Sequence, residues 1–279
     1  MRATMATDPT QLAIFAALLL AAGAGAGVIA GLLGVGGGIV VVPVLFHLFT
    51  QLGVDEAVRM KVAVGTSLAT IVATAWSSAS AHFKRGTVDR DFLKAYGPAV
   101  LVGVVAGAAV ASAVKGPVLT GIFATIALVV AAQIAFGHPD RRLGDHLPTA
   151  LPARFGIGGV IGLVSAMMGI GGGTLTVPIM TLYGTPVHRA VGTAAAMGFM
   201  IGIPGAVSFA VGGLGVDGRP PFSLGYVSLA GLALIAPTSM LCAPWGARLS
   251  HKMDTRLLRR VFAVFLVVTA ARMWWTVLG

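Results

Sequence analysis

The sequence predicts an all-α integral membrane protein made of two inverted repeats of about five apolar segments each. Three observations predict this class: the apolar composition, a glycine motif that occurs twice, and the positions of the basic residues. Hydrophobic residues make up 57% of the chain, charged residues only 10%, and the mean hydropathy is +0.93. A soluble domain carries roughly 25% charged residues. We therefore expect residues 1–279 to form a single transmembrane domain.

Several apolar stretches are long enough to cross about 30 Å of hydrocarbon as helices. They are 11–33, 62–82, 92–114, 117–136, 190–212, 224–243 and 261–278. Residues 1–27, with Arg2 ahead of an apolar run, also fit a cleavable signal peptide. The repeat described below argues against cleavage, because the matching segment of the second half is internal.

Two stretches interrupt the apolar pattern with glycines. Residues 31–45 read GLLGVGGGIVVVPVL, and residues 166–180 read AMMGIGGGTLTVPIM. The two stretches superpose Gly34, Gly36, Gly37, Gly38, Val42 and Pro43 on Gly169, Gly171, Gly172, Gly173, Val177 and Pro178. Inside a helix, glycine costs about 1 kcal/mol relative to alanine and proline about 3 kcal/mol. These stretches therefore predict glycine-broken half-helices or re-entrant hairpins.

The apolar pieces after the two breaks, 39–52 and 174–183, are short. At 1.5 Å per residue they reach only about 21 and 15 Å, less than the bilayer core. The halves then realign at AVGT, residues 63–66 and 190–193, where the first half carries extra connecting residues that include Asp55, Glu56 and Lys61. Repeat 1 is predicted at about 11–136 and repeat 2 at about 155–278.

The basic residues predict the orientation. Most of the 19 lie in three turns: Lys84, Arg85, Arg90 and Lys94; Arg141, Arg142 and Arg154; and Arg248, Lys252, Arg256, Arg259 and Arg260. The positive-inside rule makes all three turns cytoplasmic and both termini periplasmic. Each half then crosses an odd number of times, so the repeats are inverted and the glycine breaks meet near the bilayer midplane from opposite faces. This arrangement is typical of transporters.

The glycine breaks favour an anion as the substrate. The helical piece after each break begins with N–H groups that have no intrahelical partner and with about half a positive charge. Carboxylates, which a cation carrier usually needs, are almost absent from the spans. The candidate substrate-binding residues are Gly34, Gly36, Gly37, Gly38, Thr66, Ser67, Gly169, Gly171, Gly172, Gly173, Thr174, Gly192 and Thr193, with Thr176 nearby. Candidate gating or structural residues are Pro43, Pro178, Trp76 and Pro204.

Plainer interpretations stand beside this one. Glycines also allow close helix packing, and membrane hydroxyls often bond their own backbone. Gly103 lies in an unbroken span, so Gly103→Ala is expected to bind the anion nearly normally. His47 and His82 are either proton relays or structural residues. No metal or catalytic motif appears, the Lys–Ser/Thr of a nucleotide-binding loop is missing, and the basic residues form no nucleic-acid face. We expect no enzyme activity, no cofactor and no metal.

With both glycine motifs and AVGT located, the chain resembles the sulfite exporter family TauE/SafE from about residue 12 to 278. The resemblance implies a bacterial inner-membrane carrier, an exporter, of sulfur-containing anions such as sulfite or the organosulfonates sulfoacetate, taurine and isethionate. An anion channel, or a transporter of another small carboxylate or oxyanion, is the alternative. The expected partners are the anion and the lipid bilayer, with no nucleic acid; a homodimer is left open.

Overall fold

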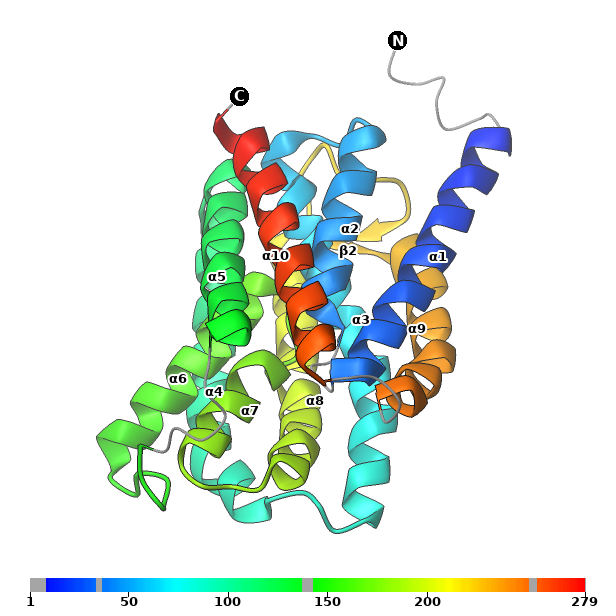
Figure 1. The fold of residues 1–279 in the computed structure, drawn as a ribbon. Helices are drawn as coiled ribbons and strands as arrows, with labels where there is room; N and C mark the ends of the chain where they lie inside the picture. Colours follow the sequence, from blue (N-terminus) through cyan, green and yellow to red (C-terminus); the bar gives the residue numbers. More distant parts are fainter. Residues whose placement is uncertain (1–8, 34–36, 137–142, 251–254, 279) are drawn as a thin grey trace.

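The computed structural model describes residues 9–33, 37–136, 143–250 and 255–278, and these are almost entirely helical (Figure 1). The helices are α1 (Pro9–Leu33), α2 (Gly38–Gln51), α3 (Glu56–Lys84), α4 (Arg90–Ala113), α5 (Gly116–Phe136), α6 (Leu151–Met168), α7 (Gly173–Leu182), α8 (Val187–Gly212), α9 (Leu229–Ser250) and α10 (Thr255–Leu278). Within the described residues, seven helices are long and apolar enough to cross a membrane. The predicted all-α membrane class is therefore confirmed.

Two predicted boundaries were wrong. Glu56 to Lys61 form the first turns of α3 and not a connection, because Asp55 caps the helix by accepting a hydrogen bond from the Ala57 N–H at 2.9 Å. The segment predicted to start at 224 begins as helix α9 only at Leu229. Before it, β1 (Ser223–Leu224) and β2 (Val227–Ser228) pair in an antiparallel hairpin around Gly225, whose φ is 56°.

The helices alternate in direction across the molecule (Figure 1). Helix α1 runs down from the top and α2 returns upwards; α3 runs down, α4 up and α5 down. In the other half, α6 runs up and α7 returns downwards; α8 runs up, α9 down and α10 up. The start of α1 and the end of α10 therefore lie on the same side, and α2 and α7 occupy opposite halves of the molecule.

The most extensive helix contacts join one half of the chain with the other. They pair α1 with α9, α4 with α6, α3 with α8 and α5 with α10. Glycines allow the first two pairs to pack backbone against backbone: a methyl group on Gly27 would overlap the Ser239 carbonyl oxygen, and one on Gly162 would overlap that of Val100. Gly103 is packed in the same way, because a methyl group there would overlap the Gly159 carbonyl oxygen, so Gly103→Ala would disturb the contact between α4 and α6; its effect on anion binding stays a prediction.

Candidate functional site

The two glycine breaks have the same local backbone geometry. Gly37 precedes α2 with φ 64° and ψ −23°, and the equivalent Gly172 precedes α7 with φ 75° and ψ −18°. Gly169 ends α6 with φ 64°. An L-residue in this left-handed region is strained, whereas glycine is not. The sequence expectation that these glycines end one helix and start another is thus met by the geometry; Gly34 and Gly36 lie outside the described residues.

The breaks lie against each other inside the molecule. A methyl group on Gly38 would overlap the Gly169 carbonyl oxygen and come within 3.1 Å of the Ile170 Cα. Ser67, fully buried on α3, donates a hydrogen bond to the Gly169 carbonyl oxygen at 2.7 Å, and its Oγ lies 3.5 Å from the Gly38 carbonyl oxygen. Ser67 therefore connects the two breaks, which come from opposite halves of the chain.

The start of α7 holds several buried backbone donors. The Gly172 carbonyl oxygen accepts hydrogen bonds from Leu175 N and Thr176 N, at 3.1 and 2.7 Å. Within the described part of the chain, the N–H groups of Gly171, Gly172, Gly173 and Thr174 have no acceptor. These residues are buried, so bulk solvent does not reach them. Free N–H groups at a helix start are the donors that bind anions in proteins.

Three buried hydroxyl groups beside this break also have no partner in the described structure. They belong to Thr174, Thr176 and Ser165, whose side chains are 4%, 0% and 0% exposed. Thr176 Oγ1 lies near the break: a methyl group on Gly172 would be 3.6 Å from it. Leaving a buried hydroxyl unpaired costs about 1–3 kcal/mol, so several at one place need an explanation.

Ser165 is the residue that sequence reasoning missed. It lies on α6 one turn before the break, and its carbonyl oxygen accepts the hydrogen bond from Ile170 N at 3.0 Å. The first glycine motif has an alanine at the matching position, Ala30, so the repeat gave no signal for it. The available signal was a single hydroxyl within an apolar span next to the GxGGG motif.

The AVGT threonines already have backbone partners. Thr66 Oγ1 accepts a hydrogen bond from Ser228 N at 2.8 Å, and Thr193 Oγ1 accepts one from Asp89 N at 2.8 Å. Ser228 and Asp89 occupy equivalent positions, since each precedes a helix and its side chain accepts from an N–H three residues later, Gly231 N or Phe92 N. A threonine of each half thus bonds to the residue that precedes a helix of the other half. A substrate contact by Thr66 or Thr193 stays a prediction.

The glycines of the two AVGT segments allow the two halves to approach each other closely at these contacts. A methyl group on Gly65 would overlap the Tyr226 carbonyl oxygen, and one on Gly192 would lie 2.7 Å from Thr87 Oγ1. Gly192 is therefore in contact with the loop that leads into α4. The three atoms nearest to such a methyl group belong to Thr87 and His82, and a substrate contact by Gly192 stays a prediction.

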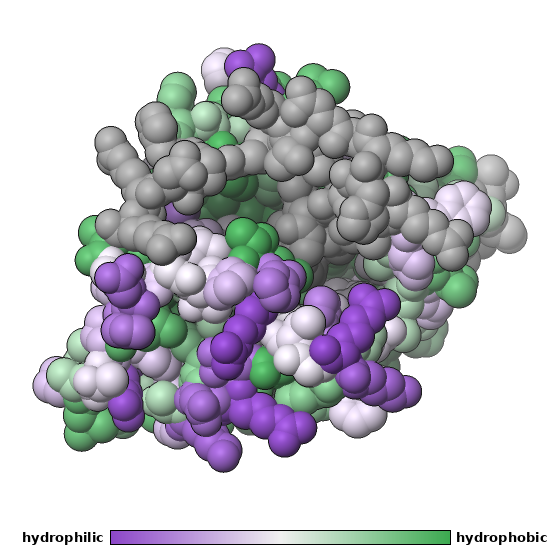
Figure 2. All heavy atoms as spheres, turned by 60° about the horizontal axis from the view of Figure 1, so that its bottom comes forward, coloured by the Kyte–Doolittle hydropathy of each residue, from purple (hydrophilic) through white to green (hydrophobic). Residues whose placement is uncertain are grey.

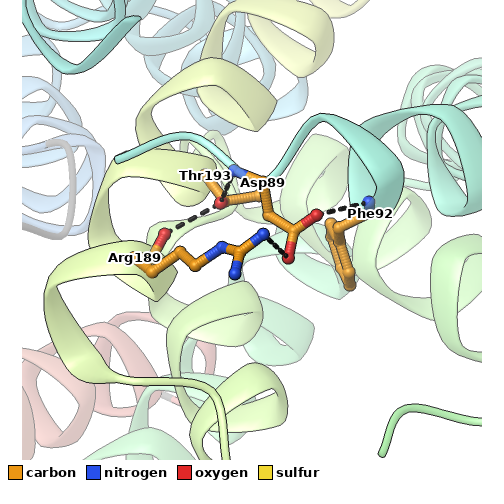
Figure 3. A network of polar contacts seen from close by, with 4 residues as sticks. All are labelled: Asp89, Phe92, Arg189 and Thr193. Carbon is orange, nitrogen blue, oxygen red and sulfur yellow. Dashed lines mark hydrogen bonds and ion pairs between the residues drawn. The ribbon is translucent and has the colours of Figure 1, made fainter. Parts of the chain in front are cut away.

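An ion pair stands beside the contact between Thr193 and Asp89 (Figure 3). The Arg189 guanidinium lies 3.2 Å from the Asp89 carboxylate, and Thr193 Oγ1 donates to the Arg189 carbonyl oxygen at 2.8 Å. At the Thr66 contact the equivalent residues are Val62 and Ser228, so no ion pair can form there. The two equivalent contacts are therefore chemically unequal.

The face that carries this ion pair is hydrophilic. Figure 2 shows hydrophilic side chains gathered on the side that lies at the bottom of Figure 1. The α3–α4 turn is at this side, and its Lys84, Arg85 and Arg90 are exposed. The top side instead holds the start of α1, the end of α10 and the β-hairpin.

The remaining candidate residues lie as follows. Pro43, Pro178 and Pro204 lie inside α2, α7 and α8, and Trp76 is 62% exposed with its ring 5.3 Å from that of Phe199. His47 packs edge-on against Phe46, and His82 Nδ1 lies 2.8 Å from Thr87 Oγ1. Among the described residues, no three His, Cys, Asp or Glu side chains lie together as a metal site would require.

Comparison with known proteins identifies the family. Residues 19–273 match the family model described as sulfite exporter TauE/SafE. A probable membrane transporter protein of Haemophilus influenzae is 35% identical over 260 residues, which cover 93% of this chain and 98% of that protein. Probable membrane transporter proteins of Bacillus subtilis and Methanocaldococcus jannaschii are 29% and 26% identical, each covering at least 90% of both chains. No solved structure matches. The chain therefore belongs to the sulfite exporter TauE/SafE family of membrane transporters.

Proposed function

We propose that this protein exports small sulfur-containing anions, such as sulfite or the organosulfonates sulfoacetate, taurine and isethionate, across the bacterial inner membrane. The observation that carries the proposal is the set of buried donors at the break before α7 that have no acceptor among the described residues. An oxyanion has several acceptor oxygens and no donor when fully ionised, so it satisfies N–H and O–H groups at once. The family to which the chain belongs supports sulfur chemistry for this anion.

In our proposal, the site binds the anion without a buried cationic side chain. Helices α2 and α7 start beside each other, and each start carries about half a positive charge. Their combined field stabilises one negative charge, and the hydroxyls of Thr174, Thr176 and Ser165 complete the shell. Such a site releases its ligand readily, because removing the anion does not leave an unpaired lysine or arginine in a low-dielectric interior.

We further propose that the two halves, about 11–136 and 155–278, are inverted repeats. The opposite directions of α2 and α7 and the matching contacts of Thr66 and Thr193 support this symmetry. The exposed basic turn at the bottom of Figure 1 supports a cytoplasmic location for that face, with both termini periplasmic. Two related gates around one central site then give alternating access.

Export of a net negative charge is favoured by an inside-negative membrane potential. The potential supplies about 2.3 kcal/mol per charge for each 100 mV, so coupling to a second ion is not required. Accumulation of the same anion inside the cell, against the potential, would need such coupling. Proteoliposomes loaded with sulfite should therefore lose it faster when a potassium gradient with valinomycin makes the interior negative.

The test compares anions on purified protein. Thermal shift with sulfite, sulfoacetate, taurine, isethionate and small carboxylates should show stabilisation by at least one sulfur anion, and proteoliposome efflux of that anion should saturate. If carboxylates alone stabilise the protein, the substrate is a small carboxylate, the alternative class, and not a sulfur anion. Flux that rises linearly with concentration would indicate an anion channel. The absence of any anion binding would reject the proposal.

A further inference from the structure

We propose that this protein binds a phospholipid with a zwitterionic amine head group at the ends of α3, α5 and α10. The head group fills a polar pocket at the start of α5, and one acyl chain follows an apolar groove between α5 and α10. The site is separate from the glycine breaks.

The polar pocket has a volume of about 480 Å³. Its charged side chains are Asp55, Glu56, Lys61 and Lys115, and the backbone at Gly116 and Pro117 forms one wall. Two acidic and two basic groups thus border the same space. A head group that carries both a phosphate and an ammonium group has matching charges, whereas a purely anionic head group meets two carboxylates as well.

The charged side chains of this pocket do not neutralise one another. In the described structure none of the four side chains forms an ion pair with another. Lys61 is 8% exposed and donates a hydrogen bond from Nζ to the Ser112 carbonyl oxygen at 2.7 Å, which leaves two of its three protons. Its Nζ also lies 5.5 Å from the centre of the Tyr226 ring. A buried ammonium fixed in this way is pre-positioned for a phosphate oxygen.

The apolar groove continues from the pocket. Its volume is about 520 Å³, and it is bordered mainly by Val118, Ile122, Ile126, Trp274 and Val277. Pro117 borders both the pocket and the groove. Gly121 also borders the groove, and a methyl group on it would lie at an ordinary contact distance, 3.4 Å, from the Trp274 ring. From Pro117 to Ile126 the helix rises about 14 Å, which accommodates most of an acyl chain.

The position of the pocket at the ends of the helices also fits a lipid head group. It lies where α3 and α5 begin and α4 ends, and the groove runs along the last turns of α10. Trp274 and Trp275 are in those turns, and Trp275 is 81% exposed. Tryptophans near the end of a span are typical of the membrane–water interface. A soluble zwitterion would fit the pocket alone and leave the groove unexplained.

Native mass spectrometry of the full chain tests the proposal. Detergent-purified protein is mixed with equal amounts of phosphatidylethanolamine and phosphatidylglycerol, and the bound lipid is counted. We expect one phosphatidylethanolamine to be retained preferentially. Glu56→Gln, which removes an ammonium partner, should lower that preference about threefold to fivefold, the effect of losing one partly exposed ionic contact.

Two tryptophan variants separate the groove from general lipid contact. Thr125→Trp fills the groove and should displace the retained lipid, whereas Val129→Trp, on the same helix and 63% exposed outside the groove, should not. Equal retention of the two lipids, or the same effect of both tryptophans, would overturn the proposal. A dimer that dissociates in Thr125→Trp would assign the groove to a second copy of the chain and overturn it as well. Anion binding at the glycine breaks is unaffected in either case.

Discussion

The strongest prediction concerns Gly172, because alanine there should affect stability and anion binding for separable reasons. At φ 75° an L-residue is strained by about 1–2 kcal/mol. The added methyl group would lie 2.6 Å from the Ile201 Cδ1 atom, the end of a flexible side chain that can turn aside. We therefore expect Gly172→Ala to unfold more easily by about 1–2 kcal/mol while remaining folded.

The same methyl group would lie 3.6 Å from Thr176 Oγ1 and beside the free N–H groups of the α7 start. It should exclude an anion from these donors. Loss of one to two hydrogen bonds to a charged oxygen, each about 1.5–3 kcal/mol, predicts an affinity at least tenfold lower. Calorimetric titration with sulfite, or with whichever anion gives the largest thermal shift, measures this change.

Gly53→Ala is the matched control for backbone strain. Gly53 follows α2 with φ 67°, and a methyl group there meets no atom within 4 Å. It should lower the apparent Tm as Gly172→Ala does and leave the affinity unchanged. Gly159→Ala, inside α6 with open space around the added methyl, should gain up to about 1 kcal/mol and bind normally. If Gly172→Ala binds the anion as tightly as Gly53→Ala, the glycine only shapes the backbone and the site lies elsewhere.

Three further predictions follow from the buried contacts and the charge pattern. Ser165→Ala and Thr176→Val should weaken anion binding by about 1–3 kcal/mol without loss of stability, since each removes a hydroxyl that has no partner among the described residues; unchanged affinity in both would exclude these groups from the site. Thr193→Val should lower the unfolding free energy by about 1–3 kcal/mol, because Asp89 N loses its acceptor, and an unchanged Tm would contradict this role. In a Cys242→Ala background, cysteines at Arg90 and Asp145 should be labelled from the cytoplasm and one at Asp217 from the periplasm; labelling of Arg90 and Asp145 from opposite sides would refute the orientation.

The sequence predicts the features that depend on local chemistry. Only glycine adopts positive φ without strain, so GxGGG within an apolar run predicts a break, and Gly37 and Gly172 have that conformation. Hydropathy predicts the long spans because each must supply apolar side chains over its whole length. Neither signal depends on which segment packs against which.

The features that the sequence did not predict depend on distant contacts. Lys61 suggested a connection outside the spans, but its ammonium group donates a hydrogen bond to the Ser112 carbonyl oxygen on α4, and the helix extends through it. Gly103 lies in an unbroken span, with no local sign that Gly159 of α6 packs against it. Thr66 and Thr193 were predicted as hydroxyl donors to the substrate, and no sequence pattern indicated that their oxygens also accept hydrogen bonds from Ser228 N and Asp89 N. Each partner lies at least 50 residues away, so no local pattern identifies it.

The helix pairs α1–α9 and α4–α6 limit how the molecule can open. Helices α1 and α9 pack backbone against backbone at Gly23 and Gly27, and α4 and α6 do so at Gly158 and Gly162, so sliding within either pair would force backbone atoms together. Each pair combines one helix from each half. A rigid movement of one half against the other would separate both pairs at once, so a movement that exposes the breaks has to keep the pairs intact. Hydrogen–deuterium exchange with and without the anion should therefore change together in α1 and α9; a change in α1, α2 and α3 with α9 unaffected would show that the halves move as units.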